Sequence, residues 1–159
     1  MAYHDELLKH ALDLAHKNPA NPEQADLRRA VSAAYYALFH LLISELVAFW
    51  NHIDSKAALA RMPQHRAMAE ASTAIQPMPF SAEDMSIVRK LKEVAQAFVQ
   101  LHDKREKADY DNSTYWSHTE TLSEVTLAAK TFVTWDSIRN APIAQAYVAS
   151  MLVKRPKGS

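Results

Sequence analysis

The sequence predicts an all-α protein, an up-and-down bundle of four to five helices with short accessory helices. A single glycine, Gly158, stands among the 159 residues, whereas strands joined by tight turns need glycine at many turns. Apolar residues recur at steps of three and four through most of the chain, which is the spacing of one helix face. The longest such segment, residues 22–53, contains no glycine and no proline after Pro22, so it predicts a long central helix.

The length and charge of the chain limit what it can be. A chain of 159 residues fits one domain with a buried core, residues 1–159, with a basic end at 154–159 outside the packed part. Lys and Arg together number 18, as do Asp and Glu, so nucleic-acid binding requires a local basic patch. The absence of cysteine excludes disulfides and thiolate chemistry.

The apolar segments do not have the form of targeting or membrane segments. The first ten residues carry acidic side chains and lack the apolar core of a signal peptide. The most apolar run, residues 37–50, is shorter than a bilayer span and includes His40 and Glu45. We therefore expect a soluble, cytoplasmic protein with no membrane contact.

The first two helices follow from apolar spacing and capping residues. Residues 5–16 place their leucines and alanines on one face, and the segment KNPANP then turns the chain. Asn21 can cap the long helix over residues 22–53, with Gln24 at the capping-box position. That helix would measure about 48 Å at 1.5 Å per residue. Its predicted inner stripe is Leu27, Val31, Ala34, Leu38, Leu41 and Glu45.

The middle of the chain predicts two short helices and a second long one. We expect helices over residues 55–61 and 64–75, separated at Pro63, and a rigid connector over residues 76–80. Ser81 and Asp84 form a capping box for a long helix that ends at Tyr110. Its apolar stripe (Val88, Leu91, Ala95, Phe98) continues at the same spacing into three polar residues, His102, Arg105 and Asp109.

The last third predicts two more helices. Residues 111–113 break the second long helix, and residues 114–117 form a loop. Ser117 or Thr119 can cap a helix that runs to about residue 139, and a last helix covers residues 142–152. The side chains predicted to face inward on the longer of these helices are Leu122, Val125, Ala129, Phe132 and Val133.

Two polar clusters are candidates for function. Arg29, Tyr36 and His40 share one face of the first long helix, where they are either an amphipathic border or part of a site. In the second cluster, His102, Arg105 and Asp109 continue a core-facing stripe, and a buried arginine must be paired. Arg105 therefore either pairs with Asp109 within its helix or faces a phosphate or a partner protein.

These clusters belong to two motifs that together resemble a known family. The first is LRRAVSAAYYALFH at residues 27–40, and the second is LHDKREKADYD at residues 101–111. Their order and spacing, with His65-Arg66 between them, resemble the small stand-alone bacterial and archaeal members of the HEPN domain family. The resemblance implies a helical bundle, frequently a homodimer with a shared polar cleft. It also implies RNA as a ligand, or partnership with a minimal nucleotidyltransferase in a toxin-antitoxin or defence system.

The RNase signature of that family is an arginine separated by four to six residues from a histidine, with no metal. Here Arg105 is followed at that spacing by Tyr110, so an RNase would need His40, His65 or His102 from elsewhere in the fold. Three functions stay open: a protein that binds RNA, a nucleotide phosphate or a partner; a metal-independent endoribonuclease; and a structural adaptor. The candidate catalytic residues are Arg105, His102, His40 and His65, and the candidate binding residues are Arg29, Tyr36, His40, Arg105, Asp109 and Tyr110.

Other motifs for chemistry are absent from the sequence. It contains no paired helical histidine motif for a metal, no glycine-rich phosphate loop and no nucleophile elbow, so we expect no metal and no cofactor. The pair Tyr115-Trp116 either stacks on a base or closes one end of the bundle. A homodimer is expected because Phe39, Ile43, Val47 and Trp50 fall outside the main stripe of the first long helix.

Overall fold

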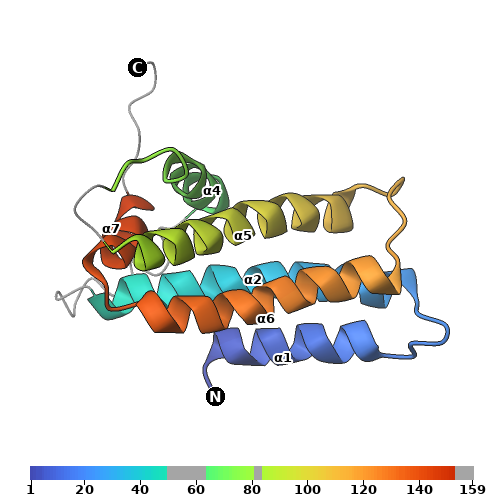
Figure 1. Cartoon of the computed structure of the whole chain (residues 1–159). Coiled ribbons are helices and arrows are strands. Elements are labelled where there is room, and N and C mark those ends of the chain that lie inside the picture. Colours follow the sequence, from blue (N-terminus) through green and yellow to red (C-terminus); the bar gives the residue numbers. More distant parts are fainter. Residues whose placement is uncertain (50–63, 81–83, 153–159) are drawn as a thin grey trace.

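A computed structural model describes residues 1–49, 64–80 and 84–152 of the chain (Figure 1). Within these ranges all regular structure is α-helical, which confirms the all-α prediction. The predicted helix over residues 55–61, Trp50, Ser81 and the basic end lie outside the described residues. The helices are α1 (Tyr3–His16), α2 (Gln24–Phe49), α4 (His65–Ala74), α5 (Met85–Tyr110), α6 (His118–Ile138) and α7 (Pro142–Ser150).

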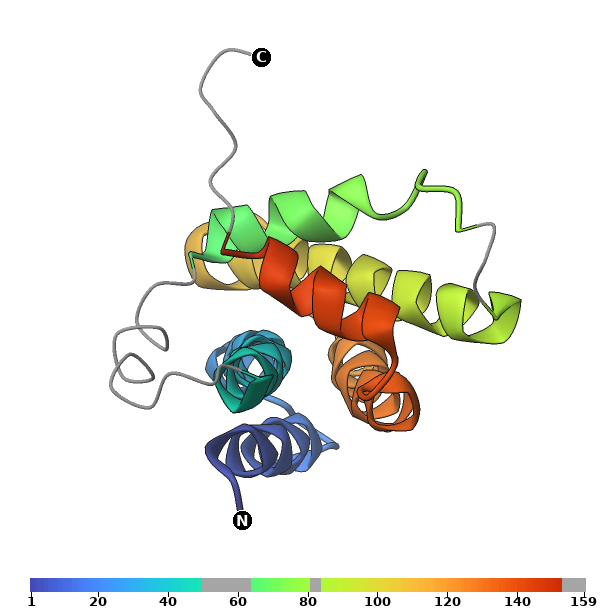
Figure 2. The same ribbon diagram turned by 90° about the vertical axis from the view of Figure 1, so that its left-hand side faces the viewer.

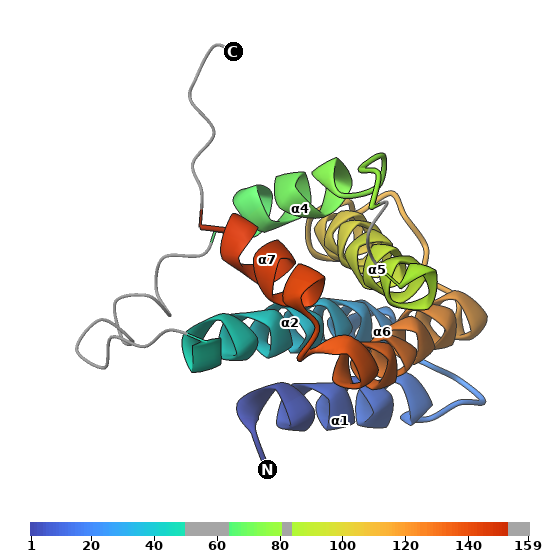
Figure 3. The ribbon, with the colours of Figure 1, turned by 60° about the vertical axis from the view of Figure 1, so that its left-hand side comes forward.

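Four of these helices form an up-and-down bundle. Helices α1, α2, α5 and α6 lie along one another and alternate in direction in that order (Figure 1). An end-on view shows α2 beside both α1 and α6 (Figure 2). Helix α5 packs against α2 and α6 on the side away from α1. The short helices α4 and α7 cover one end, where α7 crosses α2 and α4 packs against α5 (Figure 3). The predicted bundle is therefore confirmed.

Helix α2 is the centre of this bundle, as its apolar stripe predicted. It packs against α1, α5, α6 and α7, and all six residues of the predicted stripe are buried. One of the six is Glu45, whose carboxylate lies 2.9 Å from Nη2 of Arg139 at the end of α6. A buried carboxylate in the core stripe is tolerated because this ion pair compensates its charge.

The apolar surface of α2 has two further consequences. Its segment Gln24–Ala48 is long and apolar enough to cross a membrane. However, 72% of the most apolar 18-residue stretch of this segment is buried inside the bundle, as in the core helix of many globular proteins. Phe39 and Ile43, which were expected to need a second subunit, are already buried within one chain. Val47 is partly buried against the core, and Trp50 lies outside the described residues, so the homodimer stays a prediction.

Helix α5 ends in the polar cluster, as predicted, but Asp84 is its N-cap and not the third residue of a capping box, so the helix begins later than expected. Its N-cap is Asp84, whose Oδ1 accepts a hydrogen bond of 2.8 Å from the backbone N–H of Ser86. The whole predicted apolar stripe of α5 is buried, and so is Arg105 near the end of the helix. The stripe therefore carries a charged side chain into the packed interior.

Helix α6 is capped by Ser117, as predicted, but its buried face differs from the expected one. The Ser117 hydroxyl accepts a hydrogen bond of 3.0 Å from the backbone N–H of Glu120. Val133, expected to face inward, is 73% exposed. Three polar residues that the apolar pattern omitted, Thr121, Glu124 and Thr131, are buried instead. Burial is possible for Glu124 because its carboxylate accepts hydrogen bonds of 3.1 and 3.2 Å from Gln100 of α5.

Trp116 closes the end of the bundle where α5 connects to α6. Its ring is buried in a small apolar cluster with Leu27, Val31 and Ala108, so the prediction of an aromatic cover is confirmed for Trp116. Gln24 was expected to complete a capping box, but that expectation is wrong. Its amide forms two hydrogen bonds with the backbone of Trp116, at 2.6 and 3.0 Å, because the turn after α5 folds back over the start of α2.

The end of α5 is held by Arg28 from α2. The Arg28 guanidinium donates to the carbonyl oxygens of Ala108 and Asp111, at 3.0 and 2.9 Å, and also to that of Thr114. The last carbonyls of a helix lack partners within the helix, and one planar guanidinium satisfies several of them here. Arg28 thereby fixes the end of α5 that carries Arg105.

Candidate functional site

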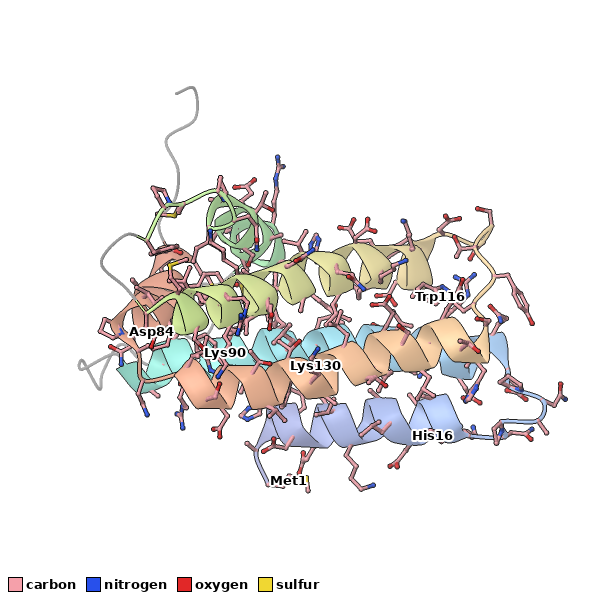
Figure 4. The ribbon with its side chains drawn as sticks, viewed as in Figure 1. Met1, His16, Asp84, Lys90, Trp116 and Lys130 are labelled. Atoms are coloured by element: carbon pink, nitrogen blue, oxygen red, sulfur yellow. The ribbon has the colours of Figure 1, made fainter. Side chains whose placement is uncertain are left out.

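Arg105 lies where α5 passes over the middle of α2. Figure 4 labels Asp84 at the beginning of α5 and Trp116 beyond its end, and Arg105 belongs to the last third of the helix, on the Trp116 side. The side chain is only 7% exposed. Its guanidinium carbon lies 5.1 Å from the ring centroid of Tyr35 and 5.8 Å from that of Tyr36. At these distances both aromatic faces attract the cation.

The charge of Arg105 is incompletely compensated by the residues around it. Its Nη1 lies 3.9 Å from Oδ2 of Asp109, which is an ion pair but too long for a hydrogen bond. The Nε–H group is buried and has no hydrogen-bond partner among the described residues. Asp109 is also engaged by the Ser32 hydroxyl, at 3.3 Å. The predicted proximity of Arg105 to Asp109 and Tyr36 is confirmed, yet the pair is too loose to satisfy a buried guanidinium.

Tyr35 connects this arginine to a histidine from another helix. The Tyr35 hydroxyl and Nδ1 of His65, the first residue of α4, form a hydrogen bond of 2.7 Å. The His65 ring also stacks on Phe39, with centroids 4.2 Å apart. Burial raises the pKa of Tyr35 well above its ordinary value, although the Arg105 charge opposes that change. Tyr35 therefore stays protonated at neutral pH.

His65 is a neutral imidazole at neutral pH. Burial lowers its pKa below the ordinary value of 6.5, and the nearby Arg105 charge lowers it further. A neutral imidazole carries one N–H donor and one basic nitrogen. His65 can therefore hold or move a proton beside a fixed guanidinium, which is the property that general acid-base catalysis requires.

A second imidazole flanks the same tyrosine ring. The centroid of His102 lies 5.6 Å from that of Tyr35, equal to the distance from Tyr35 to His65. His102 is largely buried, and its Nε2 lies 3.8 Å from a carboxylate oxygen of Glu106 one turn later. The structure thus brings three of the four catalytic candidates around Tyr35: Arg105, His65 and His102.

The remaining candidates lie outside this group. His40 packs against Phe39 and Tyr3, and burial followed by the proximity of His4 lowers the pKa of His40. Arg29 is exposed beside the structural Arg28. Tyr110 is exposed at the end of α5 and, five residues after Arg105, points from a different side of the helix. None of these three completes the surroundings of the Arg105 guanidinium.

Two residues at the centre of the site were not singled out from the sequence. Tyr35 and Ser32 both lie within the motif at residues 27–40, but neither was expected to take part in the site. Their place in the site could have been inferred once α2 was known to pack against α5. Ser32 and Tyr36 are one turn apart on the same face of α2, and Tyr35 is the residue before Tyr36. The described residues contain no group of three or more histidine or acidic side chains arranged to hold a metal ion.

Comparison with known proteins adds no relative to this picture. No family model, no curated protein and no solved structure matches the chain. The two motifs quoted above therefore carry the resemblance to the HEPN family on their own. Any function has to be argued from the geometry around Arg105.

Proposed function

We propose that the chain binds a phosphate group of RNA or of a nucleotide at the Arg105 cluster. This cluster comprises Ser32, Tyr35, Tyr36, His65, His102, Arg105 and Asp109. The observation that supports the proposal most is a buried guanidinium with a loose ion pair and an Nε–H that has no partner among the described residues. A buried cation that the residues described around it leave under-compensated is stabilised by an anionic ligand.

The chemistry of the cluster favours phosphate over other anions. The planar fork of a guanidinium matches two oxygens of a phosphate group, which yields a bidentate, charge-assisted pair. Tyr35 and Tyr36 hold the guanidinium from its sides and limit the orientations that it can adopt. The imidazoles of His65 and His102 supply further donors near the same point.

The wider setting of this function comes from the family resemblance. A HEPN-like protein of this size would act in a toxin-antitoxin or defence system, in the cytoplasm. Its partners would be a second copy of itself and a minimal nucleotidyltransferase. These parts of the proposal rest on the motifs at residues 27–40 and 101–111 alone.

A second function, metal-independent RNA cleavage, is favoured by one specific observation. The imidazole missing after Arg105 in the sequence is present in space, because His65 and His102 both contact the ring of Tyr35. His65, held neutral, would take the proton of a 2′-hydroxyl as its oxygen attacks phosphorus. The second imidazole, His102, would have to carry an extra proton and give it to the departing 5′-oxygen. Arg105 would stabilise the charge that develops on the phosphate, leaving a 2′,3′-cyclic phosphate and a free 5′-hydroxyl.

Binding of a short fluorescently labelled oligoribonucleotide tests the proposal by fluorescence anisotropy. Arg105→Gln removes the bidentate donor and should weaken binding about 30-fold, from a loss of roughly 2 kcal/mol. The matched control is Arg89→Gln, which removes the same charge from an exposed position about 24 Å away along α5. Equal affinities for the parent and Arg105→Gln would leave the structural adaptor as the explanation of Arg105.

The same samples separate a binding protein from an enzyme. Electrophoresis of the oligoribonucleotide after incubation, with and without a chelator, should show cleavage that the chelator does not affect if the endoribonuclease is present. An intact strand with saturable binding supports the binding function alone. Cleavage that the chelator abolishes would contradict the metal-independent mechanism.

A further inference from the structure

We propose that Tyr3 and His40 form a stacking site for an unpaired nucleobase next to the phosphate bound at the Arg105 cluster, so that the ligand is single-stranded RNA. This inference rests on the proposed function. It adds Tyr3, a residue that the sequence did not suggest, and an element, α1, that the Arg105 cluster does not use. The site would explain why an aromatic ring is left open at the start of α1.

The two rings already meet in the structure. Tyr3 is the first residue of α1, and its ring centroid lies 4.8 Å from that of His40 at an interplanar angle of 67°. Tyr3 is nevertheless 59% exposed, so much of its ring is open to solvent. The edge-to-face contact restricts the motion of the exposed Tyr3 ring. Less side-chain conformational entropy is therefore lost when a base stacks on it.

A continuous series of rings joins this pair to the Arg105 cluster. From Arg105 the path passes to Tyr36 at 5.8 Å, then from Tyr36 to Phe39 with centroids 6.3 Å apart. It continues from Phe39 to His40 at 5.2 Å and ends at Tyr3. Tyr36 and His40 are four residues apart on α2, which is about 6 Å along the helix axis. On α2, His40 therefore lies one helical turn from Tyr36, and the Tyr3 ring of α1 lies one ring contact beyond His40.

This combination of side chains fits a nucleic acid better than an apolar peptide. Every nucleobase has a π-face, and stacking on aromatic rings binds single strands with little regard to sequence. Burial keeps His40 largely uncharged, so its ring offers an aromatic surface without repelling the arginine nearby. A strand with one base stacked on Tyr3 and the phosphate of another nucleotide at Arg105 would use both ends of the ring series. Duplex bases are already stacked on one another, so the site selects an unpaired strand.

The test compares a labelled oligoadenylate with an abasic ribose-phosphate strand of the same length, both by fluorescence anisotropy. Tyr3→Ala should weaken oligoadenylate binding by about 5- to 150-fold, since removing one stacking side chain has an effect of this size. Tyr3→Phe keeps the ring and should bind as the parent does. Affinity for the abasic strand should be the same in the parent and in Tyr3→Ala.

A matched control is available on the connection between α5 and α6. Tyr115 is 76% exposed, and Tyr115→Ala removes an equally open phenol from outside the ring series. It should leave oligoadenylate binding unchanged. The inference is overturned if Tyr3→Ala binds oligoadenylate as the parent does, if it weakens both strands alike, or if Tyr115→Ala causes the same loss.

Failure of the stacking site and failure of the proposed function give different results. If Arg105→Gln weakens both strands while Tyr3→Ala changes neither, phosphate binding at Arg105 stands and the stacking site is wrong. If the parent binds neither strand, both are wrong. Circular dichroism of each variant should match the parent, because Tyr3 and Tyr115 are exposed and neither is needed for the core.

Discussion

Replacing Arg28 should destabilise the bundle far more than replacing its neighbour Arg29. Arg28→Met keeps an unbranched apolar stem but removes the three hydrogen bonds to the carbonyls of Ala108, Asp111 and Thr114. At about 1 kcal/mol each, the loss is about 3 kcal/mol of unfolding free energy. For a domain of this length that corresponds to a fall in Tm of about 6 to 12 °C.

Thermal unfolding followed by far-ultraviolet circular dichroism measures this loss directly. Arg29→Met is the control because Arg29 has the same side chain at the next, exposed position, and such surface changes stay within about 0.5 kcal/mol. Arg28→Lys should recover only part of the loss, since an ammonium group cannot reproduce the planar fork. If Arg28→Met melts within about 1 °C of the parent, or if Arg29→Met melts equally low, Arg28 does not hold the end of α5.

Two further predictions concern the Arg105 cluster. Asp109→Asn should tighten phosphate binding, because it removes the negative charge that lies 3.9 Å from Arg105 and competes with the ligand. Weaker binding of the oligoribonucleotide in fluorescence anisotropy would contradict this prediction. The contribution of His65 and His40 to the unfolding free energy should be constant at neutral pH and above. It should fall as the pH drops below about 6.5, because the unfolded chain then binds protons that these two buried histidines resist. His65→Gln should reduce this dependence in urea unfolding measured at several pH values, and an unchanged slope would show that His65 titrates alike in both states.

Local spacing was enough to predict most of the helices. The apolar stripes of α2 and α5 were visible because nearly all of their buried positions are apolar, and Ser117 identified the start of α6. The buried face of α6 was misplaced because several of its buried residues are polar. Glu124 can be buried only because Gln100 of α5 meets it, and that contact joins residues far apart in sequence.

The candidate site could be predicted only along single helices. The pairing of Arg105 with Asp109 follows from their spacing of four residues. The hydrogen bond between Tyr35 and His65 does not, because it depends on how α4 packs across α2 and α5. For the same reason the sequence indicated Arg29 as a ligand residue and gave no role to Arg28, although only the packed structure distinguishes the two.

The most direct test of the Arg105 cluster is the nuclear magnetic resonance signal of the Arg105 Nε–H group during titration with a short oligoribonucleotide. This group is buried and has no partner in the part of the chain that the structure describes. Its resonance therefore reports on the guanidinium itself, and Arg105→Gln identifies the signal by its loss. Phosphate binding predicts a saturable shift of this resonance with the same midpoint as the anisotropy titration. An Arg105 signal that stays fixed while the oligoribonucleotide binds would contradict the proposed phosphate site.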